Sequence, residues 1–198
     1  AHYTAPEVVK AMWAIAQRLG FRGGLVLEPS IGAGNFIGLA PPDLRKASHV
    51  TGVELDTVTG AVAKNLYPAA SIFPGTGFQD FAVPDGHFDL AIGNPPFGSE
   101  KLFDKERREL NRFSIHNYFF AKSVDGLKPN GVLAMVVTNF FLDAKAAGAK
   151  PAEMAAVFFP YGDNDYPSYT GQKAAEKRLR AAQALADGGY RYIPMIRE

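Results

Sequence analysis

The chain has 198 residues, a formal net charge of +1 and no cysteine. This length suits one domain with a sizeable core, and the lack of cysteine excludes disulfides and thiolate zinc sites while fitting a reducing cytoplasm. The near-neutral charge gives no strong pull toward nucleic acid, and no apolar run approaches the roughly 18 residues that span a membrane, so we expect a cytoplasmic protein without membrane contact.

The first predicted element is an amphipathic helix near the N-terminus. Apolar residues recur at helical spacing from Val8 to Leu19, and Gly20 ends the pattern. Thr4, with Glu7 three residues later, matches a capping box, so we expect Thr4 to cap this helix.

A short apolar strand is predicted at 25–28, and it runs into a glycine-bearing turn that opens a helix at about 35–40. The turn reads Glu28-Pro29-Ser30-Ile31-Gly32-Ala33-Gly34-Asn35-Phe36. Glycines permit positive φ and close backbone approach, which a nucleoside-bearing cofactor over a strand end requires. The third glycine of the dinucleotide fingerprint is missing, which disfavours a pyrophosphate ligand.

A second strand at 49–53 ends at Glu54, which follows Gly34 by about 20 residues, the spacing of a ribose-binding acid. Glu28 also ends a strand, where it can hold the turn or lie near a cationic amino-acid group. A solvated carboxylate at a strand terminus is the alternative for each of these two residues.

Further strands are expected at 71–73, 88–92 and 132–137, and further helices at 57–66 and 115–127. Alternation of strands and helices predicts an α/β fold, a doubly wound and mostly parallel sheet of the Rossmann-like type. Ligands of such sheets bind beyond the carboxyl ends of the strands, where Glu28, Glu54 and Asn94 all fall.

The strand at 88–92 leads into Asn94-Pro95-Pro96-Phe97. An exocyclic amine on a base is a poor nucleophile, so a catalyst needs rigid hydrogen-bond acceptors for its N–H groups. The Asn94 side chain offers one acceptor, and the prolines can fix a backbone carbonyl, that of Pro95, as a second. Phe97 offers a face on which an extruded base can stack. A proline-rich turn that closes a buried strand is the alternative.

Other features have a structural and a functional interpretation. Trp13 and the Phe119-Phe120 pair are expected in the core. His116 and Asn117 can belong to a base pocket or simply to a helix start or surface. The mixed-charge run Lys101 to Arg112 can contact phosphates, but a solvated helix or loop is favoured. Phe158 to Pro167 is expected to be irregular.

Taken together, these motifs resemble the N6-adenine DNA methyltransferases of the gamma arrangement, in which cofactor motifs precede the catalytic motif. The similarity to phage- and plasmid-type methylases is greatest, because they carry a segment like Ser114 to Ser123, and it covers about residues 1–143. The matching segments are Tyr3 to Val9 for the N-terminal Y-T-P motif with Ala5 inserted, Glu28 to Phe36 for the first cofactor loop, Val53 to Asp56 for the ribose motif, Gln79 to Phe81 for the adenine motif and Asn94 to Phe97 for the catalytic motif.

The resemblance implies S-adenosyl-L-methionine as cofactor, no metal, and direct transfer of a methyl group to a flipped adenine. Asn94 and Pro95 would polarise the target amine within a catalytic motif completed by Pro96 and Phe97. The cofactor residues that the resemblance implies are Tyr3, Thr4, Glu28, Pro29, Gly32, Gly34, Asn35, Phe36, Glu54, Leu55, Asp80 and Phe81. Among them, Glu54 would hold the ribose and Asp80 the cofactor adenine.

The resemblance also divides the chain into a cofactor-binding core at 1–143 and a C-terminal extension at 144–198, expected to pack on the same domain. No target-recognition region is found, and a chain of this length lacks room for one of the usual size. The resemblance implies duplex DNA as the partner of a restriction-modification enzyme. The missing region is expected to be a separate recognition domain, to belong to a partner subunit, or to be unnecessary because sequence specificity is minimal. A methyltransferase for RNA or protein glutamine, and a non-catalytic domain of a larger phage or plasmid protein, are the alternatives.

Overall fold

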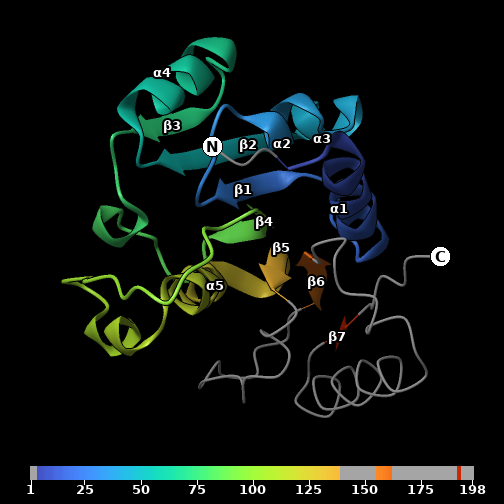
Figure 1. Ribbon diagram of the computed structural model, residues 1–198. Helices are drawn as coiled ribbons and strands as arrows, with labels where there is room; N and C mark the ends of the chain where they lie inside the picture. The colour runs from blue at the N-terminus through green and yellow to red at the C-terminus, as the bar shows by residue number, and fades with distance from the viewer. Residues whose placement is uncertain (1–3, 139–154, 162–190, 193–198) are drawn as a thin grey trace, which may run out of the picture.

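The computed structural model describes residues 4–138, 155–161 and 191–192. Its strands form one parallel sheet in the order β3-β2-β1-β4-β5-β6-β7 (Figure 1). Their bounds are β1 Gly24–Glu28, β2 Ser48–Glu54, β3 Ser71–Pro74, β4 Phe88–Gly93, β5 Leu127–Thr138, β6 Ala155–Tyr161 and β7 Arg191–Tyr192. The doubly wound parallel sheet expected from the alternating pattern is confirmed.

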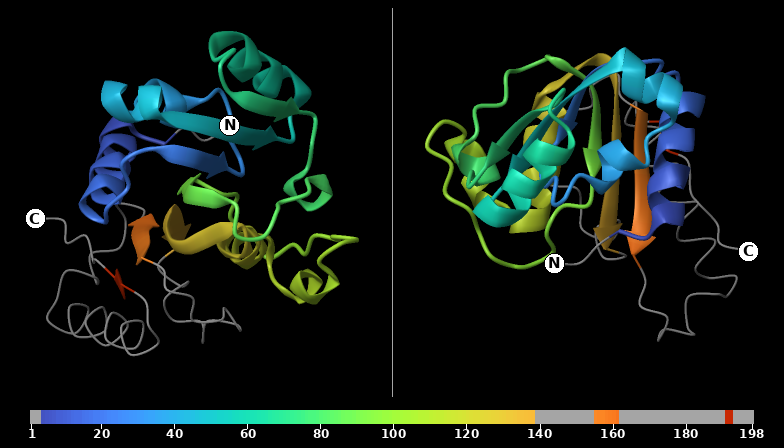
Figure 2. Two further views of the ribbon diagram at one scale, coloured as in Figure 1. Left: turned by 180° about the vertical axis from the view of Figure 1, so that it is seen from behind. Right: turned by 90° about the horizontal axis from the view of Figure 1, so that it is seen from above.

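Helices cover both faces of this sheet, and Figure 2 shows α1 and α5 on opposite sides. The helices are α1 Pro6–Arg18, α2 Asn35–Gly38, α3 Pro42–Ala47, α4 Thr57–Leu66 and α5 Ile115–Asp125, with short 3-10 turns η1 Phe78–Asp80 and η2 Arg108–Arg112. None of them has the length and apolar character to cross a lipid bilayer, within the part of the chain that the structure describes.

The two faces of the sheet carry separate apolar clusters because side chains alternate along a strand. Val26 of β1 belongs to the cluster under α1, whereas its neighbour Leu27 belongs to the cluster under α5. Trp13 and Phe119, both expected in the core, are buried in these two clusters, respectively.

The strand register places the predicted site residues together at the carboxyl ends of the strands. Glu28 pairs with Gly52 of β2, and Leu27 pairs with Ala91 of β4. The carboxyl ends of β1, β2 and β4 therefore lie side by side, followed by Pro29, Leu55 and Asn94, respectively. This edge is where ligands of doubly wound sheets bind.

Two local expectations need correction. Ala5, not Thr4, occupies the N-cap position of α1, and no side chain caps it, since the hydroxyl of Thr4 is engaged elsewhere. Phe158 to Tyr161 belongs to β6 because it pairs in register with β5. Within the described residues, β7 pairs with Ala155 and Ala156 at the start of β6, and Pro160 lies opposite Val137 of β5.

Candidate functional site

The turn after β1 needs two glycines for different reasons. Gly32 has φ +57° and Gly34 has φ +85°, a region that side chains disfavour. A Cβ on Gly34 would lie 2.4 Å from the ring of Tyr67, whereas a Cβ on Gly32 would meet no atom within 4 Å. The Gly34 position is closed by packing, and the Gly32 position opens onto free space that a ligand can enter.

The glycine turn is tied to β2 by two of its backbone donors. Ile31 N donates to Val53 O at 2.9 Å, and Gly32 N donates to Glu54 Oε2 at 2.8 Å. The other Glu54 oxygen accepts from Asp56 N at 2.9 Å. Each carboxylate oxygen retains acceptor capacity for a further donor, and the carboxylate is fixed in direction by the two backbone bonds.

Glu28 is almost completely buried, with 1% of its surface exposed. Burial, with added repulsion from Glu54, raises the pKa of Glu28 well above its ordinary value. Its Oε2 has no hydrogen-bond partner among the described residues. The solvated-carboxylate interpretation is therefore wrong for Glu28, because a carboxyl group with this burial is not solvated.

The predicted adenine-binding residues lie around the ends of β2 and β3. Leu55 is 72% exposed, and Asp80, in η1, is exposed with one carboxylate oxygen accepting from Gln79. The ring of Phe81 packs against Phe73 with centroids 4.9 Å apart. These apolar surfaces and a free carboxylate edge suit a flat, hydrogen-bonding ring.

The predicted catalytic Asn94 follows the last residue of β4. Its backbone carbonyl accepts from Ser30 Oγ at 3.0 Å, and its side-chain Nδ2 donates to Thr4 Oγ1 at 3.1 Å. Its Oδ1 is buried and has no hydrogen-bond partner within the described ranges. The side-chain amide is thus oriented by Thr4 with an acceptor left over, and an unsatisfied buried acceptor is costly unless a ligand uses it.

The rest of the catalytic motif places one ring at the surface. Pro95 is buried, Pro96 is exposed and Phe97 is 39% exposed. The Phe97 ring lies 5.1 Å from that of His116, which is 5% exposed, so the surface interpretation of His116 is wrong. Burial lowers the pKa of His116 to about 4, opposed by a hydrogen bond with the backbone of Pro96.

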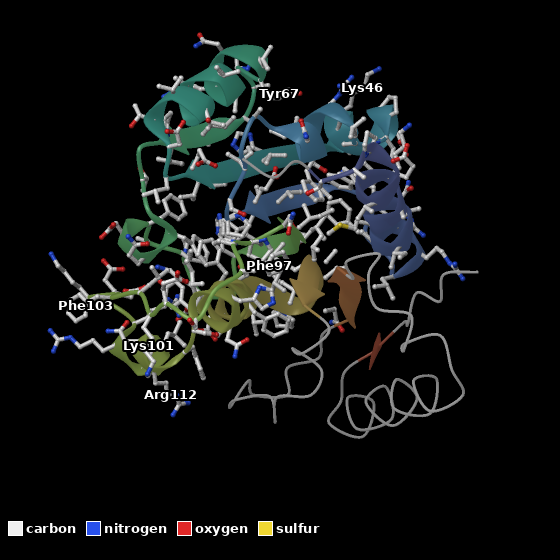
Figure 3. The ribbon with its side chains drawn as sticks, in the orientation of Figure 1. Lys46, Tyr67, Phe97, Lys101, Phe103 and Arg112 are labelled. Carbon is white, nitrogen blue, oxygen red and sulfur yellow. The ribbon has the colours of Figure 1, made fainter. Side chains whose placement is uncertain are left out.

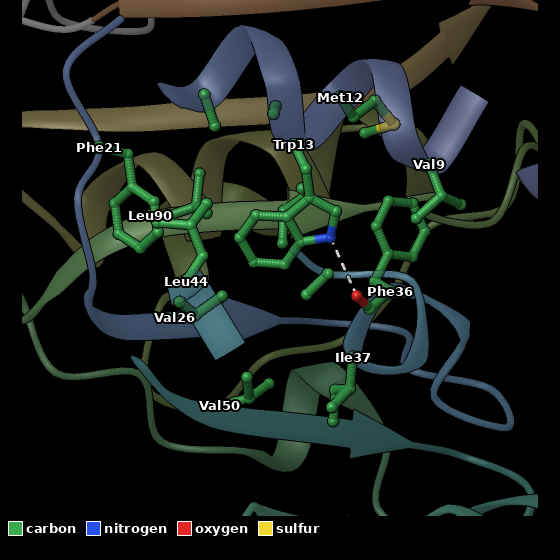
Figure 4. Packing of buried hydrophobic residues seen from close by; sticks show 14 of the residues in the cluster. Val9, Met12, Trp13, Phe21, Val26, Phe36, Ile37, Leu44, Val50 and Leu90 are labelled. Carbon is green, nitrogen blue, oxygen red and sulfur yellow. Dashed lines mark hydrogen bonds between the residues drawn. The ribbon is translucent and has the colours of Figure 1, made fainter. Parts of the chain in front are cut away.

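Some predicted cofactor residues face the interior. Phe36 is 4% exposed in the core, and its carbonyl accepts the indole N–H of Trp13 at 2.9 Å (Figure 4). Pro29 is buried, whereas Asn35 is half-buried at the start of α2. Tyr3 lies outside the described residues. A cofactor contact from Phe36 would have to come from its backbone.

A buried ionic cluster beside the site is absent from the sequence expectations. Asp104 and Lys122 are each 1% exposed, and Lys122 Nζ donates to Asp104 Oδ2 at 2.7 Å. Arg107, also in the mixed-charge run, pairs with Asp85 and Asp125. The solvated interpretation of this run is therefore wrong for Asp104 and Arg107. The sequence pattern that could have indicated this cluster is a lysine, Lys122, four residues after Tyr118 on an otherwise apolar helix.

Known structures resemble this fold. A Listeria monocytogenes protein assigned to the class I S-adenosylmethionine-dependent methyltransferases aligns over 73% of this chain and 49% of its own, with TM-score 0.57 and 18% identity. The type I restriction-modification system methyltransferase subunit from Streptococcus thermophilus aligns over 67% of this chain and 33% of its own, with TM-score 0.53 and 23% identity. The protein therefore has the class I methyltransferase fold.

Sequence comparison identifies the family. Residues 54–157, just over half of the chain, match the model of the Eco57I restriction-modification methylase. The chain belongs to this family. The modification methylase CviBIII of Paramecium bursaria Chlorella virus NC1A is 28% identical over 121 residues, which are 59% of this chain. The chain covers 31% of the length of that relative.

Proposed function

We propose that this chain is the S-adenosylmethionine-binding part of a DNA methyltransferase that modifies the N6 amine of a flipped adenine. The observation that carries the proposal is the buried, unpartnered Oδ1 of Asn94, oriented by Thr4 at the end of β4 next to the exposed ring of Phe97. A planar amine presents an N–H to such an acceptor, and its ring can stack on Phe97.

The neighbouring residues fit the proposed cofactor. The open side of Gly32 leaves room for backbone approach, and Glu54 retains acceptor capacity for ribose hydroxyls. Exposed Leu55 and the Phe81 ring would flank the adenine, while Asp80 would accept from its amine. The orphaned oxygen of Glu28 lies at the same edge, where a cationic amino-acid group could be bound.

The cofactor would supply a sulfonium methyl group: the amine lone pair forms the N–C bond, the C–S electron pair stays on sulfur, and the extra N–H proton goes to solvent. Asn94 Oδ1 and the Pro95 carbonyl would accept hydrogen bonds from the two amine N–H groups and thereby increase electron density on nitrogen. The prolines fix this geometry in advance, so positioning provides much of the rate enhancement.

Family membership supports DNA as the acceptor, since both the family model and the viral relative are methylases of the modification type. The recognition of a DNA sequence would belong to a separate domain or subunit. This proposal agrees with the observation that the chain covers only part of the length of the viral relative. We propose the same division as above, a cofactor-binding core at 1–143 and an extension at 144–198, acting in the cytoplasm.

The decisive experiment is transfer of labelled methyl from S-adenosylmethionine to duplex DNA, RNA and protein, followed by identification of the methylated nucleoside or amino acid. We expect N6-methyladenine in DNA. Asn94→Ala should lower transfer about 100-fold or more, as removal of a fixed transition-state contact does, while calorimetry shows unchanged cofactor affinity. Asn65→Ala, which truncates an exposed asparagine on α4, is the matched control.

Each part of the proposal can fail separately. Equal methyl transfer by wild type and Asn94→Ala would exclude a role of Asn94 in the reaction. Label in protein or RNA alone would replace adenine in DNA as the acceptor. Tight cofactor binding without transfer to any acceptor would favour a non-catalytic role.

A further inference from the structure

A buried carboxylate anchors the loop that follows the catalytic motif. Asp104 Oδ2 accepts from Lys122 Nζ at 2.7 Å and from Tyr118 OH at 2.5 Å. Its Oδ1 accepts from the backbone N–H of Glu106 at 2.8 Å and of Arg107 at 2.9 Å. Burial alone would raise the pKa of Asp104, but these donors outweigh it and hold the pKa at about 2. The group is an ionised, fully bonded carboxylate in the protein interior.

The same lysine also holds a second loop. Lys122 Nζ donates to the carbonyl of Phe78 at 2.8 Å and lies 5.2 Å from the centre of the Phe78 ring. Phe78 begins η1, the turn that carries Asp80. One ammonium group on α5 therefore joins the turn proposed to bind the cofactor adenine to the loop after β4.

The loop after β4 is closed where it meets the proposed target-base site. Ile115 N donates to Glu100 O at 2.6 Å, which joins the two ends of the loop next to the Phe97 and His116 rings. Asn111 bonds both backbone groups of Asp104 and so crosses the loop interior.

The outer surface of the closed loop extends away from the sheet. Phe103, which directly precedes the buried Asp104, is 64% exposed and points outward together with Lys101 and Arg112 (Figure 3). The inward anchor at Asp104 therefore determines which side chains the loop presents outside.

We infer that Lys122 is a positioning residue that fixes the cofactor-adenine turn and the loop beside the target base in one geometry. The inference rests on the proposed function for the roles of these two segments. A buried ion pair is a poor source of stability, because desolvation of both charges opposes their attraction. Its two-sided bonding is better explained by the need to place two loop segments whose only regular secondary structure is the short 3-10 turns η1 and η2.

The test compares three variants for thermal stability, cofactor affinity and amide hydrogen exchange. Lys122→Met with Asp104→Asn replaces the ion pair by neutral groups of similar size, and the new amide keeps an acceptor for the loop amides while its Nδ2 can donate to the hydroxyl oxygen of Tyr118. Lys122→Met alone leaves a buried, unpaired carboxylate. Lys128→Met is the matched control, because Lys128 pairs with Asp89, whose side chain also accepts from Leu25 N near the start of β1 at the opposite edge of the sheet.

We expect the double variant to be more stable than Lys122→Met alone but to bind S-adenosylmethionine about tenfold or more weakly than wild type, since the Phe78 carbonyl still lacks its charged donor. Exchange of the Asp80 and Phe81 amides should rise in the ligand-free double variant, with wild-type rates in Lys128→Met.

Cofactor affinity within twofold of wild type in the double variant, or unchanged exchange at Asp80 and Phe81, would overturn the inference. The exchange measurement needs no ligand. If wild type binds no cofactor, the proposed function fails, while exchange still decides whether Lys122 holds the turn. Should Lys122→Met alone not fold, the double variant still gives the result.

Discussion

Gly32 and Gly34 lie two residues apart in the turn after β1, and both have positive φ, but their surroundings differ. Alanine at either position would carry backbone strain of about 1–2 kcal/mol. At Gly34 the new methyl group would also collide with Tyr67, whereas at Gly32 it would enter open space. We expect Gly34→Ala to lower the free energy of unfolding by at least about 1 kcal/mol more than Gly32→Ala, measured by urea denaturation.

Cofactor affinity should show the opposite ranking among molecules that remain folded. The methyl group of Gly32→Ala would occupy space proposed for the cofactor, so its calorimetric affinity for S-adenosylmethionine should fall. Wild-type affinity in Gly32→Ala would show that the ligand does not approach the backbone there.

The buried histidine beside Phe97 predicts a pH dependence of stability. His116 has a pKa of about 4 in the folded protein against an ordinary value of 6.5, so the unfolded chain binds more protons between these values. The contribution of the neutral ring to the free energy of unfolding is therefore fully present above pH 6.5. Below pH 6.5 it falls by up to about 1.4 kcal/mol per pH unit, until pH 4.

Urea denaturation between pH 7.5 and 4.5 measures this effect. The stability of wild type relative to His116→Phe should fall as the pH falls, because only wild type carries the penalty of charging this ring. His49→Gln, which removes an exposed histidine, is the control. A constant difference between wild type and His116→Phe would contradict the lowered pKa.

At the scale of elements, Trp13 joins α1 to the helix that follows the glycine turn. Its indole N–H donates to the carbonyl of Phe36 in α2, and both residues are buried. Trp13→Phe would leave that carbonyl unsatisfied and should destabilise the protein by about 1–3 kcal/mol. The chain has one tryptophan, so circular dichroism is the appropriate measurement.

A neighbouring substitution separates the hydrogen bond from packing. The Phe21 ring lies 6.2 Å from that of Trp13, and Phe21→Leu alters packing without removing a donor. We expect a cost below about 1.5 kcal/mol for this change. If both variants cost the same, the indole hydrogen bond would have no special contribution.

Most elements of the first 138 residues follow from local patterns, since the five expected strands and the helices at 57–66 and 115–127 all occur close to their expected bounds. The short helix α3 and the strands β6 and β7 were missed. The sequence of β6 contains a proline and aromatic residues that favour irregular structure, but pairing with β5 provides backbone partners that local preferences do not include.

At the scale of the whole molecule, cofactor binding should stabilise the folded state, because an unfolded chain offers no site. At a cofactor concentration 100 times the dissociation constant, stabilisation amounts to about 2.7 kcal/mol. For a protein of this size, that corresponds to a rise in Tm of about 5–10 °C. Differential scanning calorimetry with and without S-adenosylmethionine measures it.

Variants distinguish the cofactor end of the site from its catalytic end. At the cofactor concentration used for wild type, Asn94→Ala should show the same rise in Tm as wild type. Glu54→Ala should show a smaller rise relative to its own ligand-free form, since it lacks the acceptor proposed for ribose. A full rise in Glu54→Ala would exclude this role.

The sequence by itself determined the class of fold and the positions of Glu28, Glu54 and Asn94 at strand ends, because strand alternation, glycine turns and the Asn-Pro-Pro pattern act over a few neighbouring residues. Only the tertiary structure showed that Thr4 orients Asn94 across 90 residues, and that Lys122 reaches Phe78 across 44. Such contacts depend on which segments the packed sheet brings together. A residue's local pattern does not specify a partner that is distant in sequence, so the orientation of the site had to come from the fold.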